Sequence, residues 1–192
     1  MRKIIVSEHV TLDGFLAGPN GEMNWIKIDN ELFDFVGEFT NNADAALYGR
    51  VTYEMMNSYW PTAGDKPNAS KHDIEHSKWY NSVDKIVLST TMENTDDKTT
   101  VLRNDIPAEI EKLKSQAGKD ILIFGSPRAV HTLMAHNLID EYWLFVNPVI
   151  LGEGIPLFAN IKSKINLELI SSKVFASGVN GMHYKVITTN YQ

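Results

Sequence analysis

The 192-residue sequence predicts an α/β fold, a three-layer sandwich with a mostly parallel central sheet. Apolar runs of strand length recur along the chain, and amphipathic helical patterns lie between them. Two strand-like segments follow one another near the C-terminal end, so the sheet is expected to close with an antiparallel hairpin. One domain over residues 1–192 is expected, because a chain of this length buries one core and is short for two.

Most of the apolar runs do not alternate with polar residues, and they are rich in Ile, Val, Leu and aromatic residues. Such runs are typical of strands that are buried on both faces of a sheet. Strands are therefore predicted over residues 3–10, 45–48, 85–89, 120–124 and 141–151. The hairpin is predicted over residues 166–175 and 182–189, with a turn that contains Asn180 and Gly181, a pair that favours positive φ.

Three apolar stripes with helical spacing lie between the predicted strands. They consist of Leu32, Phe35, Val36 and Phe39, of Ile110, Leu113 and Ala117 after Pro107, and of Val130, Leu133 and Met134. Residues 61–77 are rich in Pro, Gly, Asn, Lys and His, so this segment is predicted to be a loop.

Composition argues against several classes of function. The formal net charge of −6 argues against nucleic-acid binding, which needs Lys and Arg to neutralise phosphates. Because the chain has no cysteine, it has no disulfide, thiol nucleophile or Cys-ligated metal, which fits a reducing cytoplasm. The N-terminal apolar run is too short for a signal peptide, and no run approaches the roughly 20 apolar residues of a membrane span. A cytoplasmic protein that binds neither nucleic acid nor membrane is expected.

One pair of histidines has the spacing of a metal site. His72 and His76 lie four residues apart, with Asp73 and Glu75 nearby, a spacing that could place two ligands on one helix face. Because no third ligand is indicated, a solvated loop is the preferred interpretation and no metal is expected.

The strongest local signal for ligand binding follows the apolar run at residues 121–124. This run leads into Gly125, Ser126 and Pro127 and then into a predicted helix. Ser126 is a favoured N-cap residue, and Pro127 suits the first helical position. A strand that passes through glycine into a helix start presents backbone N–H groups and the positive end of a helix dipole, which together bind phosphate. An ordinary capped helix is the alternative.

Two more strand ends carry residues suited to an anion. Gly49 allows close approach of a ligand, Arg50 can grip a phosphate with its planar guanidinium group, and Thr52 adds a hydroxyl. A solvated arginine at a helix start is the alternative there. Ser89 and Thr90 offer hydroxyls to a ribose or its phosphate. Because open parallel sheets bind ligands outside the carboxyl ends of their strands, the three strand ends together predict a site for a dinucleotide phosphate.

Short motifs that follow one another along most of the chain carry a resemblance. They are residues 11–17 followed by Trp25 and Ile26, residues 43–45 with Gly49 and Thr52, residues 85–89, Asp140 with Glu141, residues 148–154, and Leu157 with Phe158. In this order they resemble the superfamily of dihydrofolate reductase and the reductase domain of riboflavin biosynthesis. The resemblance implies a dihydrofolate-reductase-like fold, and the riboflavin-type relatives imply a homodimer.

The resemblance further implies that NADPH binds across the carboxyl edge of the sheet. Seven residues are assigned to this cofactor: Gly49, Arg50 and Thr52 at its phosphates, Ser89 and Thr90 at the adenosine ribose and its 2′-phosphate, and Gly125 and Ser126 at its pyrophosphate. These assignments agree with the interpretation of the strand ends given above.

The substrate side is assigned by the same resemblance. The loop from Asp13 to Trp25 is implied to border the nicotinamide and the substrate, so Asp13 and Trp25 are candidates for substrate binding, with a simple turn at Asp13 as the alternative. Dihydrofolate reductases place an acid at the start of the next helix, where counting from Trp25 reaches Asn30, between Asp29 and Glu31. Asp13, Asp29 and Glu31 are therefore the candidate catalytic acids.

The predicted function is NADPH-dependent reduction of a small molecule. Hydride would pass to a C=N or C=O group of a pterin, pyrimidine or related heterocycle, as in dihydrofolate reductase or 5-amino-6-(5-phosphoribosylamino)uracil reductase. A non-catalytic ligand-binding module on the same fold is the alternative, because Phe124 and Gly125 stand where the relatives carry paired glycines. An interaction protein that uses the aromatic residues Tyr59, Trp60, Trp79 and Tyr80 is a third hypothesis.

Overall fold

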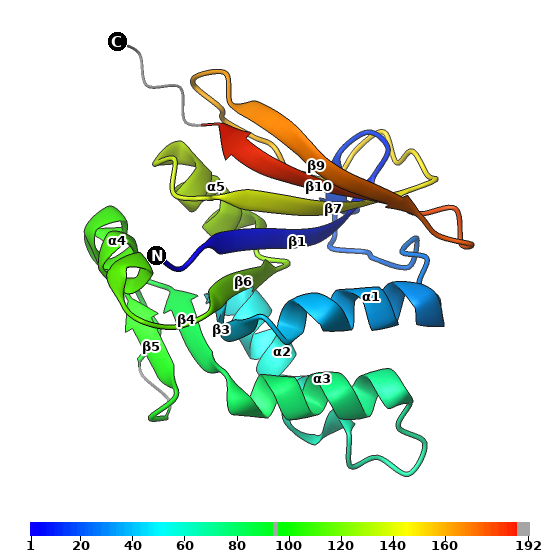
Figure 1. Cartoon of the computed structure of the whole chain (residues 1–192), viewed down its shortest axis with the longest axis horizontal. Coiled ribbons are helices and arrows are strands. Elements are labelled where there is room, and N and C mark those ends of the chain that lie inside the picture. The colour runs from blue at the N-terminus through cyan, green and yellow to red at the C-terminus, as the bar shows by residue number, and fades with distance from the viewer. Residues whose placement is uncertain (94–95, 188–192) are drawn as a thin grey trace.

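The computed structural model describes residues 1–93 and 96–187, and within them an eight-stranded sheet forms the centre of the molecule (Figure 1). The strand order is β5-β4-β3-β6-β1-β7-β10-β9. The strands are β1 (Ile4–Thr11), β3 (Ala43–Gly49), β4 (Asp84–Leu88), β5 (Thr99–Leu102), β6 (Asp120–Phe124), β7 (Glu141–Asn147), β9 (Asn166–Val174) and β10 (Asn180–Ile187). A separate small sheet pairs β2 (Phe15–Ala17) with β8 (Ile155–Pro156).

The strands from β5 to β7 are parallel to their neighbours, and β10 and β9 close the sheet as an antiparallel hairpin. The first strand of the chain, β1, is central: it pairs with β6 on one side and with β7 on the other. The predicted α/β class, the mostly parallel sheet and the closing hairpin are therefore confirmed. Parallel pairing also brings the carboxyl ends of β1, β3, β4 and β6 to one edge of the sheet.

Helices cover both faces of the sheet. They are α1 (Asn30–Thr40), α2 (Arg50–Ala63), α3 (Lys71–Ser82), α4 (Ile106–Ser115) and α5 (Pro127–Ala135). Along β1, Ile4 and Val6 pack into the same apolar cluster as Val130 of α5, whereas Ile5 packs into the cluster that contains Leu32 of α1. This alternation gives the three layers, and Figure 1 shows α5 and α1 on opposite sides of β1.

The structure corrects the prediction of a loop over residues 61–77. Helix α2 continues to Ala63 with Pro61 in its last turn, and α3 begins at Lys71. Ser70 accepts a hydrogen bond from the Asp73 N–H, and the Asp73 carboxylate accepts one from the Ser70 N–H, so a capping box starts α3. The polar composition of α3, which lacks a clear apolar stripe, concealed this helix.

The hairpin turn lies earlier than predicted. Phe175 N–H donates to the Val179 carbonyl at 2.9 Å, and Gly178 adopts the positive φ, +84°, that this turn requires. Asn180 and Gly181 instead begin β10, where a Cβ on Gly181 would lie 3.1 Å from the Phe175 ring. The glycine therefore serves close packing and not the turn.

Several predicted bounds also change. The strand that begins at Glu141 ends at Asn147 and not at residue 151, and α4 ends at Ser115, so Ala117 lies outside it. Strand β5 and the small sheet were not predicted. Residues 188 and 189 of the predicted last strand lie outside the described residues. No helix of the described residues is long and apolar enough to span a bilayer.

Candidate cofactor and substrate cleft

A cleft of about 1100 Å³ opens at the edge of the sheet where the parallel strands end. Its walls come from the ends of β1, β3, β4, β5 and β6 and from α1, α2, α3 and α5. All seven residues predicted to bind the cofactor line it: Gly49, Arg50, Thr52, Ser89, Thr90, Gly125 and Ser126. Three segments that are far apart in the sequence thus meet at one cavity.

Gly49 joins β3 to α2 at the floor of this cleft. It occupies the N-cap position of α2, and no side chain of the described residues caps that helix end. A Cβ built on Gly49 would meet no described atom within 4 Å, so its surroundings are open space. The first N–H groups of α2 therefore remain available to an anion.

Gly125 and Ser126 join β6 to α5, and both adopt left-handed backbone conformations, with φ of +64° and +65°. Ser126 holds the predicted N-cap position, but its hydroxyl does not cap α5. It accepts a hydrogen bond at 3.0 Å from the Gly49 N–H and so ties the end of β6 to the end of β3. A Cβ on Gly125 would lie 3.1 Å from the Thr52 methyl group, so the two loops are packed closely.

Arginines surround this end of the cleft. Arg50 is about half exposed and pairs with Glu54 one turn along α2, at 3.0 Å. Two further arginines line the cleft, Arg103 after β5 and Arg128 in the first turn of α5. In the sequence, Arg103 directly follows a strand and Arg128 lies at the start of a helix. Arg103 was not identified as a candidate because strand β5 was not predicted. Arg50 and Arg128 thus lie in the first turns of the two uncapped helices, where an anionic ligand finds positive charge, while Arg103 donates to the Met92 carbonyl beside the turn after β4.

Ser89 continues the cofactor side of the cleft beyond β4. Its hydroxyl accepts hydrogen bonds from the Thr91 and Met92 N–H groups, at 3.3 Å and 3.0 Å, and so orders the turn after the strand. Thr90 is exposed in this turn. Both side chains lie where the sequence placed them, at the rim of the cleft.

Asp13 is not among the described residues that line the cleft. Its carboxylate accepts hydrogen bonds from the Thr11 hydroxyl at 2.6 Å and from the Gly152 N–H at 2.8 Å. These contacts, led by the Thr11 hydroxyl, hold the pKa of Asp13 below its usual value. The carboxylate thus ties the loop after β1 to the loop after β7.

Asp29, Glu31 and Trp25 are also not among the described residues that line the cleft. Asp29 caps α1 through the Leu32 N–H at 2.8 Å and accepts from the Ser177 N–H at 3.1 Å, and these bonds lower its pKa. Glu31 pairs with Lys173 at 3.0 Å, and Trp25 donates to the Glu22 carbonyl at 3.1 Å. Leu16, Ala17 and Met23 of this loop line the cleft, as do Ile26 and Ile28 after it, so the segment before α1 contributes apolar side chains there.

Glu8 is the carboxylic acid that the cleft contains, and the sequence analysis did not identify it. It lies near the end of β1, is only 5% exposed and lines the cavity. Its Oε1 atom is buried with no hydrogen-bond partner among the described residues. Burial raises the pKa of Glu8 well above its usual value, against the opposite effect of the Gly125 N–H. The signal available in the sequence was a charged residue inside an apolar strand.

Aromatic rings form another part of the cleft wall. They are Phe33 of α1, Trp60 of α2, His72 and His76 of α3, and Phe124 of β6, which we call the ring wall. The interpretation of the two histidines as part of a solvated loop is therefore wrong, because both rings pack against neighbouring rings on a helix. Within residues 1–93 and 96–187, no group of three or more acidic or histidine side chains is placed to hold a metal ion.

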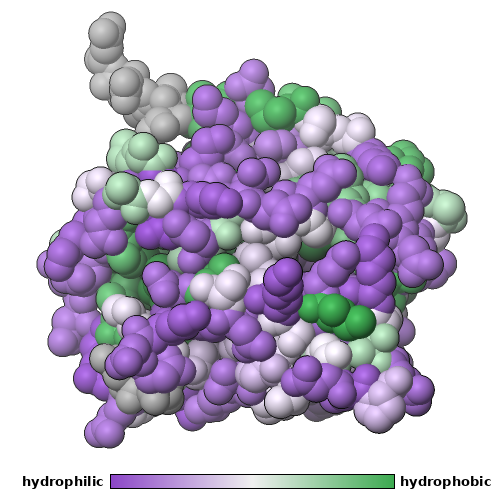
Figure 2. All heavy atoms as spheres, turned by 60° about the horizontal axis from the view of Figure 1, so that its bottom comes forward, coloured by the Kyte–Doolittle hydropathy of each residue, from purple (hydrophilic) through white to green (hydrophobic). Residues whose placement is uncertain are grey.

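The hypothesis of an exposed aromatic interaction surface is not supported. Trp79 and Tyr80 are buried in the core beneath α3, with exposed fractions of 9% and 1%. The face that carries α3 comes forward in Figure 2, where hydrophilic residues dominate and apolar atoms form only small separate areas. Trp60 turns into the cleft instead.

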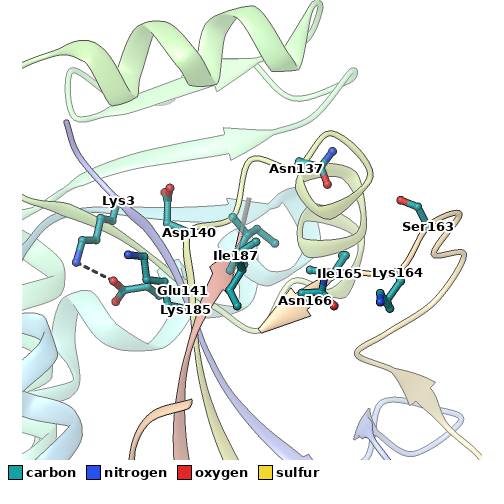
Figure 3. A pocket seen from close by; sticks show the side chains of 12 residues that line it. Lys3, Asn137, Asp140, Glu141, Ser163, Lys164, Ile165, Asn166, Lys185 and Ile187 are labelled. Atoms are coloured by element: carbon teal, nitrogen blue, oxygen red, sulfur yellow. Dashed lines mark hydrogen bonds and ion pairs between the residues drawn. The ribbon is translucent and has the colours of Figure 1, made fainter. Parts of the chain in front are cut away.

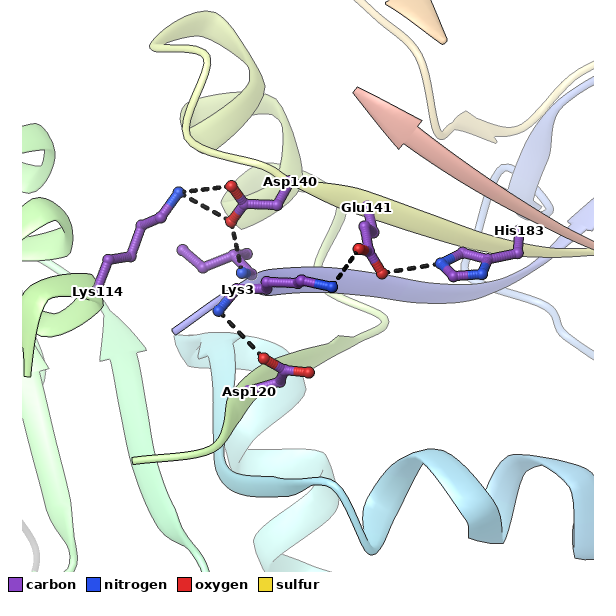
Figure 4. A network of polar contacts seen from close by, with 7 residues as sticks. Lys3, Lys114, Asp120, Asp140, Glu141 and His183 are labelled. Atoms are coloured by element: carbon purple, nitrogen blue, oxygen red, sulfur yellow. Dashed lines mark hydrogen bonds and ion pairs between the residues drawn. The ribbon is translucent and has the colours of Figure 1, made fainter. Parts of the chain in front are cut away.

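A second hollow, of about 430 Å³, lies at the amino ends of the parallel strands (Figure 3). Its acids are already paired, as Figure 4 shows. Asp140 binds Lys114 at 2.8 Å, and Glu141 binds both Lys3 at 2.7 Å and His183 at 2.8 Å. These contacts fasten α4 and β10 to the centre of the sheet, so we assign this hollow a structural role.

Comparisons of sequence agree with this architecture. The model of the RibD C-terminal domain family matches residues 2–180. The uncharacterized protein YyaP of Bacillus subtilis (strain 168) is 38% identical over 178 residues, which are 93% of this chain and 92% of that protein. The uncharacterized protein YwjB of the same organism is 27% identical over 184 residues, 95% of this chain and 97% of that protein.

Solved structures share the fold over 97% of this chain. A Shewanella sp. PV-4 protein ascribed to riboflavin biosynthesis has a TM-score of 0.76 at 22% identity and is covered over 99%. A pyrimidine reductase-like protein from Corynebacterium diphtheriae has a TM-score of 0.68 at 15% identity, with 92% covered. The diaminohydroxyphosphoribosylaminopyrimidine deaminase/5-amino-6-(5-phosphoribosylamino)uracil reductase of Thermotoga maritima has a TM-score of 0.65 at 15% identity, with 57% covered. With the family model matching nearly its whole length, this chain belongs to the RibD C-terminal domain family and has its dihydrofolate-reductase-like fold.

Proposed function

We propose that this protein is an NADPH-dependent reductase that transfers hydride to a C=N or C=O group of a pterin, pyrimidine or related heterocycle. The main support for this proposal is that the seven residues assigned to the cofactor, which follow three separate strands, all line one cleft. The reductase-like fold of the family supports the same proposal.

The residues of the cleft fit the phosphates of a dinucleotide. The amino ends of α2 and α5 have no side-chain cap within the described parts of the chain, and both open toward the cleft. Gly49 leaves space where a Cβ would stand, and Arg50, Arg103 and Arg128 supply positive charge. Free backbone N–H groups beside guanidinium groups are the donors that phosphate oxygens prefer.

When bound, NADPH supplies hydride to the carbon of the C=N or C=O bond, one proton reaches the nitrogen or oxygen, and NADP⁺ leaves. Burial raises the pKa of Glu8 well above its usual value and so favours the protonated carboxyl, which makes this residue our candidate to hold a proton at the cleft. We therefore add Glu8 to the predicted acids Asp13, Asp29 and Glu31, whose carboxylates are engaged with other groups outside the cleft.

A calorimetric titration with NADPH and with NADH tests the proposal. We expect one site per chain and tighter binding of NADPH. Arg50→Ala should weaken the binding of NADPH, because it removes a guanidinium group assigned to the cofactor phosphates, and a larger loss for NADPH than for NADH would assign Arg50 to the 2′-phosphate. Lys71→Ala is the matched control, since Lys71 is a cation on α3 that pairs with Asp34 away from the cleft.

Either of two results would decide against the proposal. If neither NADPH nor NADH binds, the proposal that the protein uses a nicotinamide cofactor is wrong. Binding without oxidation of NADPH, across a panel of pterins, pyrimidines and quinones, favours the alternative of a ligand-binding module without turnover.

A further inference from the structure

The ring wall forms an aromatic surface of the cleft that extends from α1, α2 and α3 to Phe124, the residue before Gly125. The Phe33 and His72 rings are stacked with centroids 3.7 Å apart and planes 15° apart. The His76 ring lies 4.1 Å from the ring of Trp60 and 5.9 Å from that of Phe124. The cleft residues contributed by neighbouring segments are also apolar: Met23, Ile26, Ile28, Leu32, Val36, Met55 and Met56.

The ring wall carries no charge at neutral pH. Burial lowers the pKa of His72, against the smaller effects of Asp73 and Glu75. Burial also lowers the pKa of His76 to about 3, with a further contribution from His72. Both imidazoles are therefore neutral at pH 7, and they present flat ring faces in place of cations.

The positive charges of the cleft come from residues outside the ring wall. Among the described lining residues, the permanently charged cations are Arg50, Arg103 and Arg128. Arg50 begins α2 and Trp60 belongs to its last turns, so the two are about 15 Å apart along the helix axis. Arg50 thus begins about three turns of helix away from a ring that stacks on Trp60, and Arg128 lies on α5, on the opposite face of the sheet from α1.

The helix starts near the ring wall already hold carboxylates of the chain itself. Asp29 caps α1, and Asp73 takes hydrogen bonds from the Ser70 N–H and, through its other oxygen, from the Tyr59 hydroxyl. Tyr59 lines the cleft, so the carboxylate of Asp73 stands directly behind its wall. A substrate phosphate placed here would meet these two carboxylates and occupied N–H groups, in contrast to the open starts of α2 and α5. The nearby Lys66 ammonium lies 3.7 Å from the centroid of the Tyr59 ring and is engaged by that ring.

We propose that the substrate is a flat, uncharged ring system without a phosphate group, such as an unphosphorylated heterocycle or a quinone, and that it stacks on the ring wall. This inference rests on the proposed reductase function and narrows its substrate. It sets this protein apart from a reductase of phosphoribosylamino-uracil, whose substrate carries a phosphate.

Riboflavin and FMN are suitable probes, because they share one ring system and one side chain and differ by a phosphate. The protein is first saturated with NADP⁺, so that the proposed cofactor site is occupied. Calorimetry verifies this binding. Each flavin is then titrated and followed by its fluorescence anisotropy. We expect riboflavin to bind one per chain and FMN to bind at least about tenfold more weakly.

Variants locate the binding surface. Trp60→Ala should weaken riboflavin roughly 3–10-fold and Trp60→Phe should recover most of the loss, as expected for stacking of rings. Phe158→Ala removes an exposed aromatic residue outside the cleft and should change nothing. Circular dichroism establishes that each variant is folded.

The outcomes separate this inference from the proposed function. Equal or tighter binding of FMN, no binding of riboflavin, or an unchanged riboflavin affinity in Trp60→Ala overturns the inference even when NADP⁺ binds normally. Failure to bind NADP⁺ overturns the proposed function instead. In that case riboflavin is titrated without cofactor. Binding that weakens in Trp60→Ala supports the ring wall as a binding surface, and absence of binding overturns it.

Discussion

Glu8 combines features that seldom occur together, a charged residue type, nearly complete burial and one oxygen without a partner within the described structure. An ionised carboxylate in this position lacks the compensation that buried charges need. Burial therefore favours the protonated, uncharged form of the carboxyl, and this preference raises the pKa of Glu8 well above its usual value.

Replacement of Glu8 by glutamine should change how stability depends on pH. The folded-state pKa lies above the unfolded-state value, so between the two the folded protein binds the proton more strongly and wild-type stability falls as pH rises. The glutamine side chain cannot ionise, so the stability of the variant relative to the wild type should increase as the pH rises above the unfolded-state pKa of the glutamate, by at most about 1.4 kcal/mol per pH unit. Urea unfolding at a series of pH values measures the difference. The exposed Glu31→Gln is the control, and parallel curves for Glu8→Gln and the wild type would contradict the prediction.

Gly49 offers a test of cofactor contact that is independent of folding. Its φ of −81° suits any residue and a Cβ meets no described atom within 4 Å, while alanine is a poorer N-cap residue but loses less backbone entropy on folding, so Gly49→Ala should unfold at about the same urea concentration. If phosphate oxygens lie against this backbone, the added methyl group should weaken NADPH binding at least about tenfold. Calorimetry on the folded variant checks this. Unchanged affinity would place the phosphates elsewhere.

The cleft position of the glycine and hydroxyl residues was predictable from the sequence, whereas that of the acids was not. Gly49, Ser89 and Gly125 each follow directly on a buried run, and parallel pairing of the runs brings their ends to one edge. Asp13 and Asp29 lie in loops, where the direction of a side chain depends on distant partners. The Gly152 and Ser177 N–H groups that bind these two acids are more than 130 residues away, beyond the reach of local patterns.

A comparison of α1 and α3 shows why the sequence predicted the first helix and not the second. Helix α1 has a clear apolar stripe, since Phe35, Val36 and Phe39 pack against one core cluster. Helix α3 inserts histidines where an apolar stripe would be expected, and their neutral rings take the place of apolar side chains. Its capping box, Ser70 with Asp73, was the remaining signal, and it is easily overlooked in a stretch of polar residues.

The packing of α3 should depend on pH through His76. The unfolded chain takes up a proton near pH 6.5, whereas the folded protein does so only near pH 3, so stability should fall as pH drops between these values. His76→Phe keeps a ring against Trp60 and removes the titration. Between pH 6.5 and pH 4 the variant should lose less stability than the wild type, by up to about 1.4 kcal/mol per pH unit. Chemical unfolding measures this, with the exposed His136→Phe as control, and an unchanged slope in His76→Phe would refute it.

At the scale of the whole molecule, the cleft couples both faces of the sheet. Its walls include Leu32 and Trp60 from one side and Ala129 and Thr132 of α5 from the other. A cofactor that binds there contacts elements of all three layers, so binding should raise the stability of the entire domain.

Saturation with NADPH should therefore raise the thermal unfolding midpoint. At a free concentration of about 100 times the Kd, binding to the folded state contributes about 2.7 kcal/mol, which corresponds to roughly 5–10 °C for a chain of this size. Differential scanning calorimetry with rising NADPH measures the shift, and Arg50→Ala should show a smaller one at the same concentration. A midpoint that does not move with NADPH would contradict cofactor binding.

The central place of β1 has a consequence for synthesis of the protein. This strand is synthesised well before both of its partners, which begin at Asp120 and Glu141. At translation rates of roughly 5–20 residues per second, β1 waits roughly 5–20 s for β6. During that time Ile4, Ile5 and Val6 have no strand to pair with, so nascent chains that stop short of Asp120 leave this apolar strand exposed to chaperones and proteases.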